Sequence, residues 1–244
     1  MHNLGHTRSA RRSSYLLQTP DTFVRTQIPG SGKANAIVHT SPAMSARFTQ
    51  YSVEFEAGGV LGEAVGQRFV YVLEGSVRLH TRARTYTLAK NGYAYIPQGA
   101  EHSFTAFDAA RVEVIEKPYR SIPNIEPPDL LVGQESQIEG LPCMGDGDLR
   151  VRALLPDTPA FDFAVNTMVY APGAALSLVE IHVMEHGLMM LEGGGIYRLD
   201  DDWHPVTAGD FIWMAPYCPQ WFGAIGKQPA KYLIYKDSNR HPLA

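Results

Sequence analysis

The sequence has little that would tie the protein to nucleic acid, to a bilayer or to an oxidising compartment. Its only cysteines, Cys143 and Cys218, stand far apart without CxxC spacing, which argues against a disulfide framework and a thiolate zinc site. The net charge is −4 and the pI is near 6, so nucleic acid and anionic membranes, which need clustered Lys and Arg, are disfavoured as partners. No apolar run approaches the length of a bilayer span, and the N-terminus lacks the apolar segment of a secretory signal. We therefore expect a soluble, cytoplasmic protein.

Long helical patterns are also scarce. Apolar residues come in short alternating runs, as in Tyr51, Val53 and Phe55, and Gly, Asp, Asn and Pro separate these runs. A period of two is typical of β-strands, and the spacing of the turn residues suits an antiparallel sandwich or barrel. The sequence therefore predicts an all-β protein.

The chain contains the same unit twice. Residues 70–97, which begin VYVLEGSVRL, are similar to residues 188–216, which begin LMMLEGGGIYRL. The offset between matched residues is nearly constant: Gly75 to Gly193 is 118, Gly92 to Gly209 is 117, and His102 to Gln220 is 118. A constant offset indicates a common architecture.

The length of 244 residues suits two domains of about 120 residues each. Between the two units, Pro118, Pro123, Pro127 and Pro128 mark a stretch that is unsuited to regular structure. We place the boundary there and expect domains at residues 1–122 and 123–244.

The second unit contains a candidate set of metal ligands. If residues 176–183 form one strand, Glu180 and His182 project from the same face, together with Leu176 and Leu178. That face should be the barrel interior, where an unpaired carboxylate is costly and a metal partner relieves the cost.

His186 and Gln220 would complete an N/O set with these two residues. Such a set suits Mn, Fe, Ni or Zn, and its oxygen donors favour Mn or Fe. Any one of these side chains alone would more simply be a surface or hydrogen-bonding residue.

The first unit lacks this set. The corresponding positions hold Gly62, Ala64 and Arg68, and only His102 keeps the second motif. We expect no metal site there, and we interpret His102 as a structural or pocket residue.

The spacing in the second unit resembles the cupin signature, in which two His separated by one residue are followed by a Glu and a Gly, and a second motif supplies another His. Here the donors are permuted. Glu180 and His182 stand at the two His positions, His186 at the Glu, Gly193 at the Gly and Gln220 at the last His. The resemblance implies two tandem cupin barrels of the double-stranded β-helix or jelly-roll type, a bicupin.

Four stretches of the second half resemble one cupin family more closely. They are VEIHVMEHG at 179–187, the DDWHPV turn, PQWF at 219–222 and YKDSNR at 235–240, and they are similar to (S)-ureidoglycine aminohydrolase. The resemblance implies Mn²⁺, or another divalent metal, held by Glu180, His182, His186 and Gln220. It also implies a homo-oligomer that hydrolyses ureidoglycine to ureidoglycolate and ammonia in allantoin and purine breakdown.

The same resemblance implies that Tyr197, Tyr232 and Lys236 contact a small-molecule substrate. Tyr232 and Lys236 are four apart and face the same way in a strand. A lysine there would hold the substrate carboxylate while a tyrosine donates to the ureido oxygen. Glu180 and Lys236 are the candidates for proton transfer.

Two alternatives remain open at this point. A cupin dioxygenase or decarboxylase would use a similar N/O set with iron for oxygen chemistry, and fold alone does not separate it from a hydrolase. A non-catalytic metabolite-binding cupin would retain a ligand without turnover.

Overall fold

The computed structural model describes residues 5–240 and is built from β-strands, with three short 3-10 helices at Pro20–Thr22, Pro42–Met44 and Glu135–Gln137. None of the helical segments in this range is long and apolar enough to span a bilayer. The chain divides into two compact units. We call them the N-terminal unit (24–138 and 158–162) and the C-terminal unit (5–23, 139–157 and 163–240).

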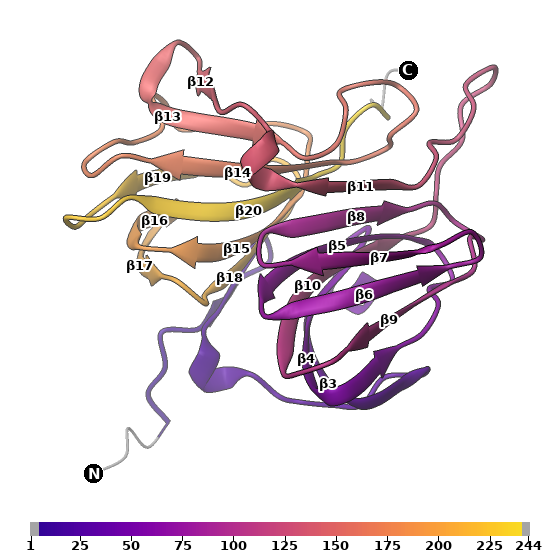
Figure 1. Cartoon of the computed structure of the whole chain (residues 1–244). Helices are drawn as coiled ribbons and strands as arrows, with labels where there is room; N and C mark the ends of the chain where they lie inside the picture. Colours follow the sequence, from indigo (N-terminus) through magenta and orange to yellow (C-terminus); the bar gives the residue numbers. More distant parts are fainter. Residues whose placement is uncertain (1–4, 241–244) are drawn as a thin grey trace. The chain divides into compact units, whose positions relative to one another are not determined.

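The N-terminal unit is a nine-stranded sheet with a closed apolar core. In the sheet the order is β11-β8-β5-β10-β4-β9-β6-β7, and β3 pairs with β4 (Figure 1). The predicted alternation on β4 is confirmed, because Tyr51, Val53 and Phe55 lie in the core cluster. The strands are β3 (Ser31–Thr40), β4 (Thr49–Leu61), β5 (Gln67–Glu74), β6 (Ser76–Thr81), β7 (Thr85–Ala89), β8 (Gly92–Ile96), β9 (His102–Ala106), β10 (Ala110–Lys117) and β11 (Leu131–Gln134).

The C-terminal unit repeats this plan with two sheets. The larger has the order β1-β2-β18-β15-β20-β14-β13-β12, and the smaller has the order β17-β16-β19 (Figure 1). Leu188, Tyr197, Phe222 and Tyr232 belong to its core cluster. The strands are β1 (Ala10–Arg11), β2 (Tyr15–Gln18), β12 (Leu141–Cys143), β13 (Asp146–Ala153), β14 (Ala164–Tyr170), β15 (His186–Glu192), β16 (Gly194–Leu199), β17 (Asp202–Thr207), β18 (Phe211–Met214), β19 (Gln220–Ala224) and β20 (Ala230–Lys236).

The expected domain ranges 1–122 and 123–244 need correction at two places, the N-terminal segment and the boundary between the domains. Strand β2 pairs with β18, from Tyr15 opposite Met214 onward, so residues 5–23 belong to the C-terminal unit. Strand β11 pairs with β8, so the chain as far as residue 138 belongs to the N-terminal unit. In each case a ladder of backbone hydrogen bonds joins a segment to a sheet that is distant in sequence.

The strand expected over residues 176–183 is wrong. Only two isolated bridges occur, Ala175 with Gly223 and Glu180 with Gln220, and the backbone bends between them. The bend breaks the period-two alternation of side chains. As a result Leu176 is buried, whereas Leu178 points outward and is 52% exposed. Leu178 is therefore not an interior residue.

The repeated glycine has the same task in both units. Gly75 and Gly193 have positive φ values of 71° and 64°. A Cβ would lie 2.7 Å from Ala109 O in the first case and 2.4 Å from Pro229 O in the second. Each glycine joins two strands, β5 to β6 and β15 to β16, in a turn too tight for a side chain. The motif glycine is thus a structural residue.

Candidate metal centre and substrate pocket

One cavity of the C-terminal unit, of about 170 Å³, gathers all seven residues expected to bind metal or substrate. They come from β15, β16, β19, β20 and the bridge region before β15. The cavity is lined by Cys143, Met144, Val151, Met168, Leu176, Glu180, His182, Met184, His186, Tyr197, Gln220, Tyr232, Ile234 and Lys236.

Four of these side chains converge on one point. His182 Nε2 lies 3.3 Å from His186 Nε2, 2.9 Å from Gln220 Nε2 and 3.9 Å from Glu180 Oε2. The backbone holds the cluster, because Glu180 and Gln220 exchange two hydrogen bonds of 2.9 and 3.0 Å. His186 begins β15, so the sheet itself fixes its position.

His186 is buried as a neutral imidazole. Its Nδ1–H donates to Tyr235 O at 3.1 Å, which leaves a lone pair on Nε2. Burial, together with the nearby His182 and Lys236, lowers the pKa of His186 to about 3. A neutral imidazole with its other nitrogen tied to a carbonyl is the form that binds metals.

His182 presents its own Nε2 toward the same point. The Gln220 amide donates to His182 Nε2, which puts the His182 proton on Nδ1, and that buried atom has no partner within residues 5–240. Two imidazole lone pairs therefore face each other, an arrangement that a cation would relieve. Turning the Gln220 amide over would present its oxygen to the same point.

The spacing of these donors fits a divalent ion. Donors bound at about 2.1 Å lie roughly 3.0–3.4 Å apart along the edges of a tetrahedron or octahedron, and the distances from His182 to His186 and Gln220 are close to this. The cluster is open at Glu180. Within the described chain, no group of three or more His, Cys, Asp or Glu side chains is gathered closely enough to hold a metal ion by itself.

Lys236 lies at the end of β20, directly opposite His186 in the ladder. With its amide oxygen turned toward the ammonium, Asn166 accepts from Lys236 Nζ at 3.2 Å. Burial lowers the pKa of Lys236, and the Glu180 charge acts in the opposite direction. The cavity thus holds one amine and one carboxyl side chain besides its imidazoles.

Tyr197 and Tyr232 form the inner wall of the cavity. Both are fully buried, and burial raises their pKa values well above that of an ordinary phenol. Both therefore remain protonated, and their hydroxyl groups are available to a polar ligand. Tyr232 and Lys236 both line the cavity, as their spacing on a strand predicts.

The sequence reasoning missed the residues that surround this set. Asn166 and Tyr170 lie on β14, and only the period-two pattern Asn166, Met168, Tyr170 would have indicated a shared face. Cys143 at the end of β12 and Met144 in the turn that follows also line the cavity. No motif marks that turn.

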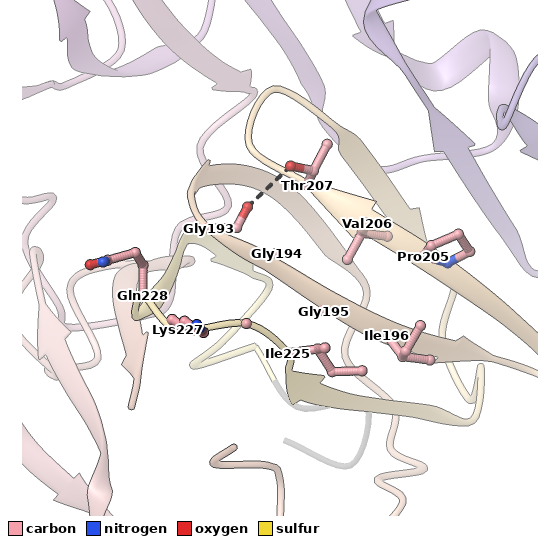
Figure 2. Close-up of a pocket in the computed structure, with 11 residues that line it drawn as sticks. Gly193, Gly194, Gly195, Ile196, Pro205, Val206, Thr207, Ile225, Lys227 and Gln228 are labelled. Atoms are coloured by element: carbon pink, nitrogen blue, oxygen red, sulfur yellow. Dashed lines mark hydrogen bonds between the residues drawn. The ribbon is translucent and has the colours of Figure 1, made fainter. Parts of the chain in front are cut away.

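A second hollow of the C-terminal unit has a different character (Figure 2). It is an open depression bordered by the run Gly193–Gly195, by residues 205–207 of β17 and by the turn at 225–228. Thr207 Oγ1 donates to Gly193 O at 3.2 Å across it. Its lining contains no carboxylate or imidazole, so it does not offer the chemistry of the first cavity.

Comparison with known proteins agrees with this geometry. The family described as Cupin domain matches residues 166–235. A protein of Oryza sativa subsp. japonica named "Probable (S)-ureidoglycine aminohydrolase" is 38% identical over 98% of this chain and 78% of its own length. The (S)-ureidoglycine aminohydrolase of Escherichia coli K12 is 32% identical over 94% of this chain and 90% of its own.

The chain belongs to the (S)-ureidoglycine aminohydrolase family.

Solved structures confirm the cupin fold. The crystal structure of protein Ylba from E. coli superposes with a TM-score of 0.86 at 28% identity, covering 98% of this chain and 97% of that one. Oxalate decarboxylase from Bacillus subtilis superposes with a TM-score of 0.71 at 12% identity, covering 95% of this chain and 79% of that one. The second likeness is one of fold alone. The prediction of an all-β cupin is therefore confirmed.

Proposed function

We propose that the protein catalyses the metal-dependent hydrolytic deamination of (S)-ureidoglycine to (S)-ureidoglycolate and ammonia, a step of purine (allantoin) catabolism. The observation that carries this proposal is the meeting of all seven expected residues in one cavity of the C-terminal unit. The names of the curated relatives support the substrate.

Glu180, His182, His186 and Gln220 are the proposed metal ligands, and Mn²⁺ is the metal we favour, because the set combines imidazole with harder oxygen donors. A bound divalent ion would polarise the substrate and acidify water at neutral pH. The Nε2 atoms of His182 and His186, which lie 3.3 Å apart, support this assignment.

The remaining polar side chains are proposed to bind and orient the substrate. Lys236 Nζ would pair with the substrate carboxylate, and the hydroxyl groups of Tyr197 and Tyr232 would bind the ureido group. The burial of the two tyrosines excludes competing water, which strengthens the hydrogen bonds of their hydroxyl groups.

The reaction replaces one bond to carbon by another. The C–N bond to the amino group breaks, a C–O bond to water forms, and one proton passes from the water to the departing nitrogen. Glu180 and Lys236 are the proposed carriers of that proton. The 26% exposure of the Glu180 side chain leaves it room to reach both the water and the nitrogen.

The test is to purify the protein without chelator, load Mn²⁺ and follow ammonia release from freshly made ureidoglycine, with spontaneous decay subtracted. Metal-dependent release that is abolished in His182→Ala and Gln220→Ala is the expected result. Absence of release from protein with bound metal would refute the substrate assignment. Oxygen uptake with ferrous iron would instead favour a dioxygenase, and ligand retention without turnover would favour a binding protein.

Two further predictions accompany this proposal. We expect a homo-oligomer, which light scattering of the purified protein tests directly. We also expect a cytoplasmic location, which cell fractionation tests.

A further inference from the structure

The pocket tyrosine Tyr232 has a second tyrosine behind it. Tyr170 ends β14 and Tyr232 lies on β20, and these two strands pair antiparallel. The two hydroxyl oxygens are 2.6 Å apart, and both side chains are fully buried. Tyr232 lines the cavity but Tyr170 does not. Tyr232 thus borders the ligand space, and its hydroxyl is hydrogen-bonded to a tyrosine that does not border it.

The rings of this pair are held by packing. Phe222 contacts both, with ring centroids 4.9 Å from Tyr170 and 5.8 Å from Tyr232, and it also packs on Tyr197 at 5.6 Å. The Tyr170 and Tyr232 rings are themselves 5.5 Å apart. Because the rings are fixed by these contacts, rotation of each hydroxyl hydrogen is the freedom that remains.

The available hydrogen-bond partners indicate which of the two tyrosine hydroxyl groups donates to the other. Within the part of the chain that the structure describes, Tyr232 is the hydrogen-bond partner of the Tyr170 hydroxyl, and no other is found for it. If Tyr232 donated to Tyr170, the Tyr170 hydrogen would be buried without an acceptor, which is costly. If Tyr170 donates, the Tyr232 hydrogen turns toward the cavity, where a ligand or water accepts it.

We propose that Tyr170 is a positioning residue: it donates to Tyr232 and thereby makes Tyr232 a hydrogen-bond donor toward the substrate. The proposal rests on the proposed function, since it assigns the ureido carbonyl oxygen as the acceptor. Consecutive donation from Tyr170 to Tyr232 to the substrate also polarises the second bond. The site accordingly selects ligands that place an acceptor oxygen at this wall and discriminates against ligands that place a donor there.

The kinetic test uses Tyr170→Phe, Tyr232→Phe and the double variant in the metal-loaded protein. Each single change removes a hydroxyl and keeps the ring. We expect Tyr170→Phe to lower kcat/KM about fivefold, the effect of one neutral hydrogen bond, mainly through a higher KM. The double variant should be no worse than Tyr232→Phe alone, because Tyr170 acts only through Tyr232. Additive losses, or an unchanged KM in Tyr170→Phe, would overturn the proposal.

A matched control lies in the other unit. Tyr95 is also fully buried and donates to Gln67 Oε1 at 2.9 Å. Tyr95→Phe removes a buried tyrosine hydrogen bond far from the cavity residues in sequence, and it should lower thermal stability while leaving KM unchanged. If the loss of a buried hydrogen bond acted only by weakening the structure in general, KM would change similarly in Tyr170→Phe and Tyr95→Phe.

A second readout does not require activity. In protein labelled with ¹³C at the tyrosine Cζ position, the Tyr232 signal reports hydrogen bonding to its oxygen. We expect this signal to shift in Tyr170→Phe and to stay in place in Tyr95→Phe. An unmoved signal would refute the hydrogen bond even in an inactive protein, whereas a shifted signal together with failed ammonia release would place the error in the proposed function.

Discussion

The two units build the same barrel around different centres. In the C-terminal unit, His186 faces Lys236 across the ladder, and in the N-terminal unit Arg68 faces Glu116. Arg68 Nε donates to Glu116 Oε1 at 2.7 Å, and the Arg68 side chain is only 3% exposed. An ion pair thus stands where the other unit has an imidazole and a lysine.

Other polar groups of the N-terminal unit form hydrogen bonds with Arg68 and Glu116. Arg68 Nη1 also donates to Gly62 O at 2.5 Å and lies 3.0 Å from His102 Nε2, while Tyr51 donates to Glu116. His102 Nδ1 is 2.7 Å from Ala100 O. Both ring nitrogens of His102 have partners from its own unit, so His102 is a structural residue there, one of the two roles expected for it.

The comparison teaches that one fold accommodates two solutions for a polar barrel centre. In the N-terminal unit the donors satisfy one another. In the C-terminal unit two imidazole lone pairs converge, which leaves the cluster incomplete without a ligand. Matched changes in the two units test this contrast.

The largest effect is expected from a comparison of one motif histidine from each unit, His182 and His102. His182→Ala should lower metal-dependent ammonia release by at least about 100-fold, more than changes of outer metal-site residues commonly cost. His102→Ala should leave release within about twofold, because its partners lie in the ion-pair network. Steady-state assays at saturating metal measure both. Equal losses in the two variants would contradict the division of roles.

Breaking the ion pair should mainly affect stability. Arg68→Met leaves the Glu116 carboxylate without its buried partner, and we expect a loss of about 3–5 kcal/mol in the free energy of unfolding. Urea titration measures it. The double variant Arg68→Met, Glu116→Gln removes the orphaned charge and should recover part of the loss. If Arg68→Met were as stable as the parent protein, the ion pair between Arg68 and Glu116 would not be what stabilises the centre of the N-terminal barrel.

A buried carboxyl group of the N-terminal unit should make stability depend on pH. Glu113 accepts from Gln50 Nε2 at 2.8 Å and from Ser52 Oγ at 2.6 Å, and burial raises its pKa to about 7. Because the pKa of Glu113 is higher in the folded protein, its protonated form stabilises the fold. This contribution to the free energy of unfolding is complete below the unfolded pKa near 4.5 and is lost as pH rises through 7.

The matched variant for this prediction is Glu113→Gln, which does not titrate. Between pH 4.5 and 8 the parent should lose about 2–3 kcal/mol of unfolding free energy relative to the variant. Denaturant titrations of both proteins across this range give the difference. A difference that does not change with pH would refute the raised pKa.

The smallest effect tests the corrected path before β15. Leu178→Ser should change the unfolding free energy by no more than about 0.5 kcal/mol, since the side chain is exposed. Leu176→Ala should cost about 2–3 kcal/mol, because that side chain is buried in the core cluster. Similar losses of stability for the two variants would contradict the bend and support a continuous strand over residues 176–183.

Local patterns predicted much of the fold and of the candidate site. The alternation on β4 and the constant offset of the glycines describe interactions between near neighbours, and both are confirmed. Tyr232 and Lys236 lie on one face of a regular strand, so their spacing sufficed. The spacing of Glu180 and His182 also brought both to the cavity, although the strand expected there does not exist.

The failures have a common physical origin. The exposure of Leu178 follows from a bend between two bridges to β19, and no residue nearby in the sequence reveals it. The contribution of Asn166 and Tyr170 follows from the pairing of β14 with β20, which joins residues more than 60 positions apart. Pairings over such distances depend on the whole sheet.

The sequence by itself determined the strand content, the duplication and the types of donor atom in the second unit, because side-chain chemistry and period-two alternation are properties of short segments. Tertiary structure alone decided which unit holds residues 5–23 and how the donors face one another. It also decided which hydroxyl lies behind Tyr232. These outcomes depend on hydrogen-bond ladders and packing between strands distant in the chain, which form only when the sheets are complete.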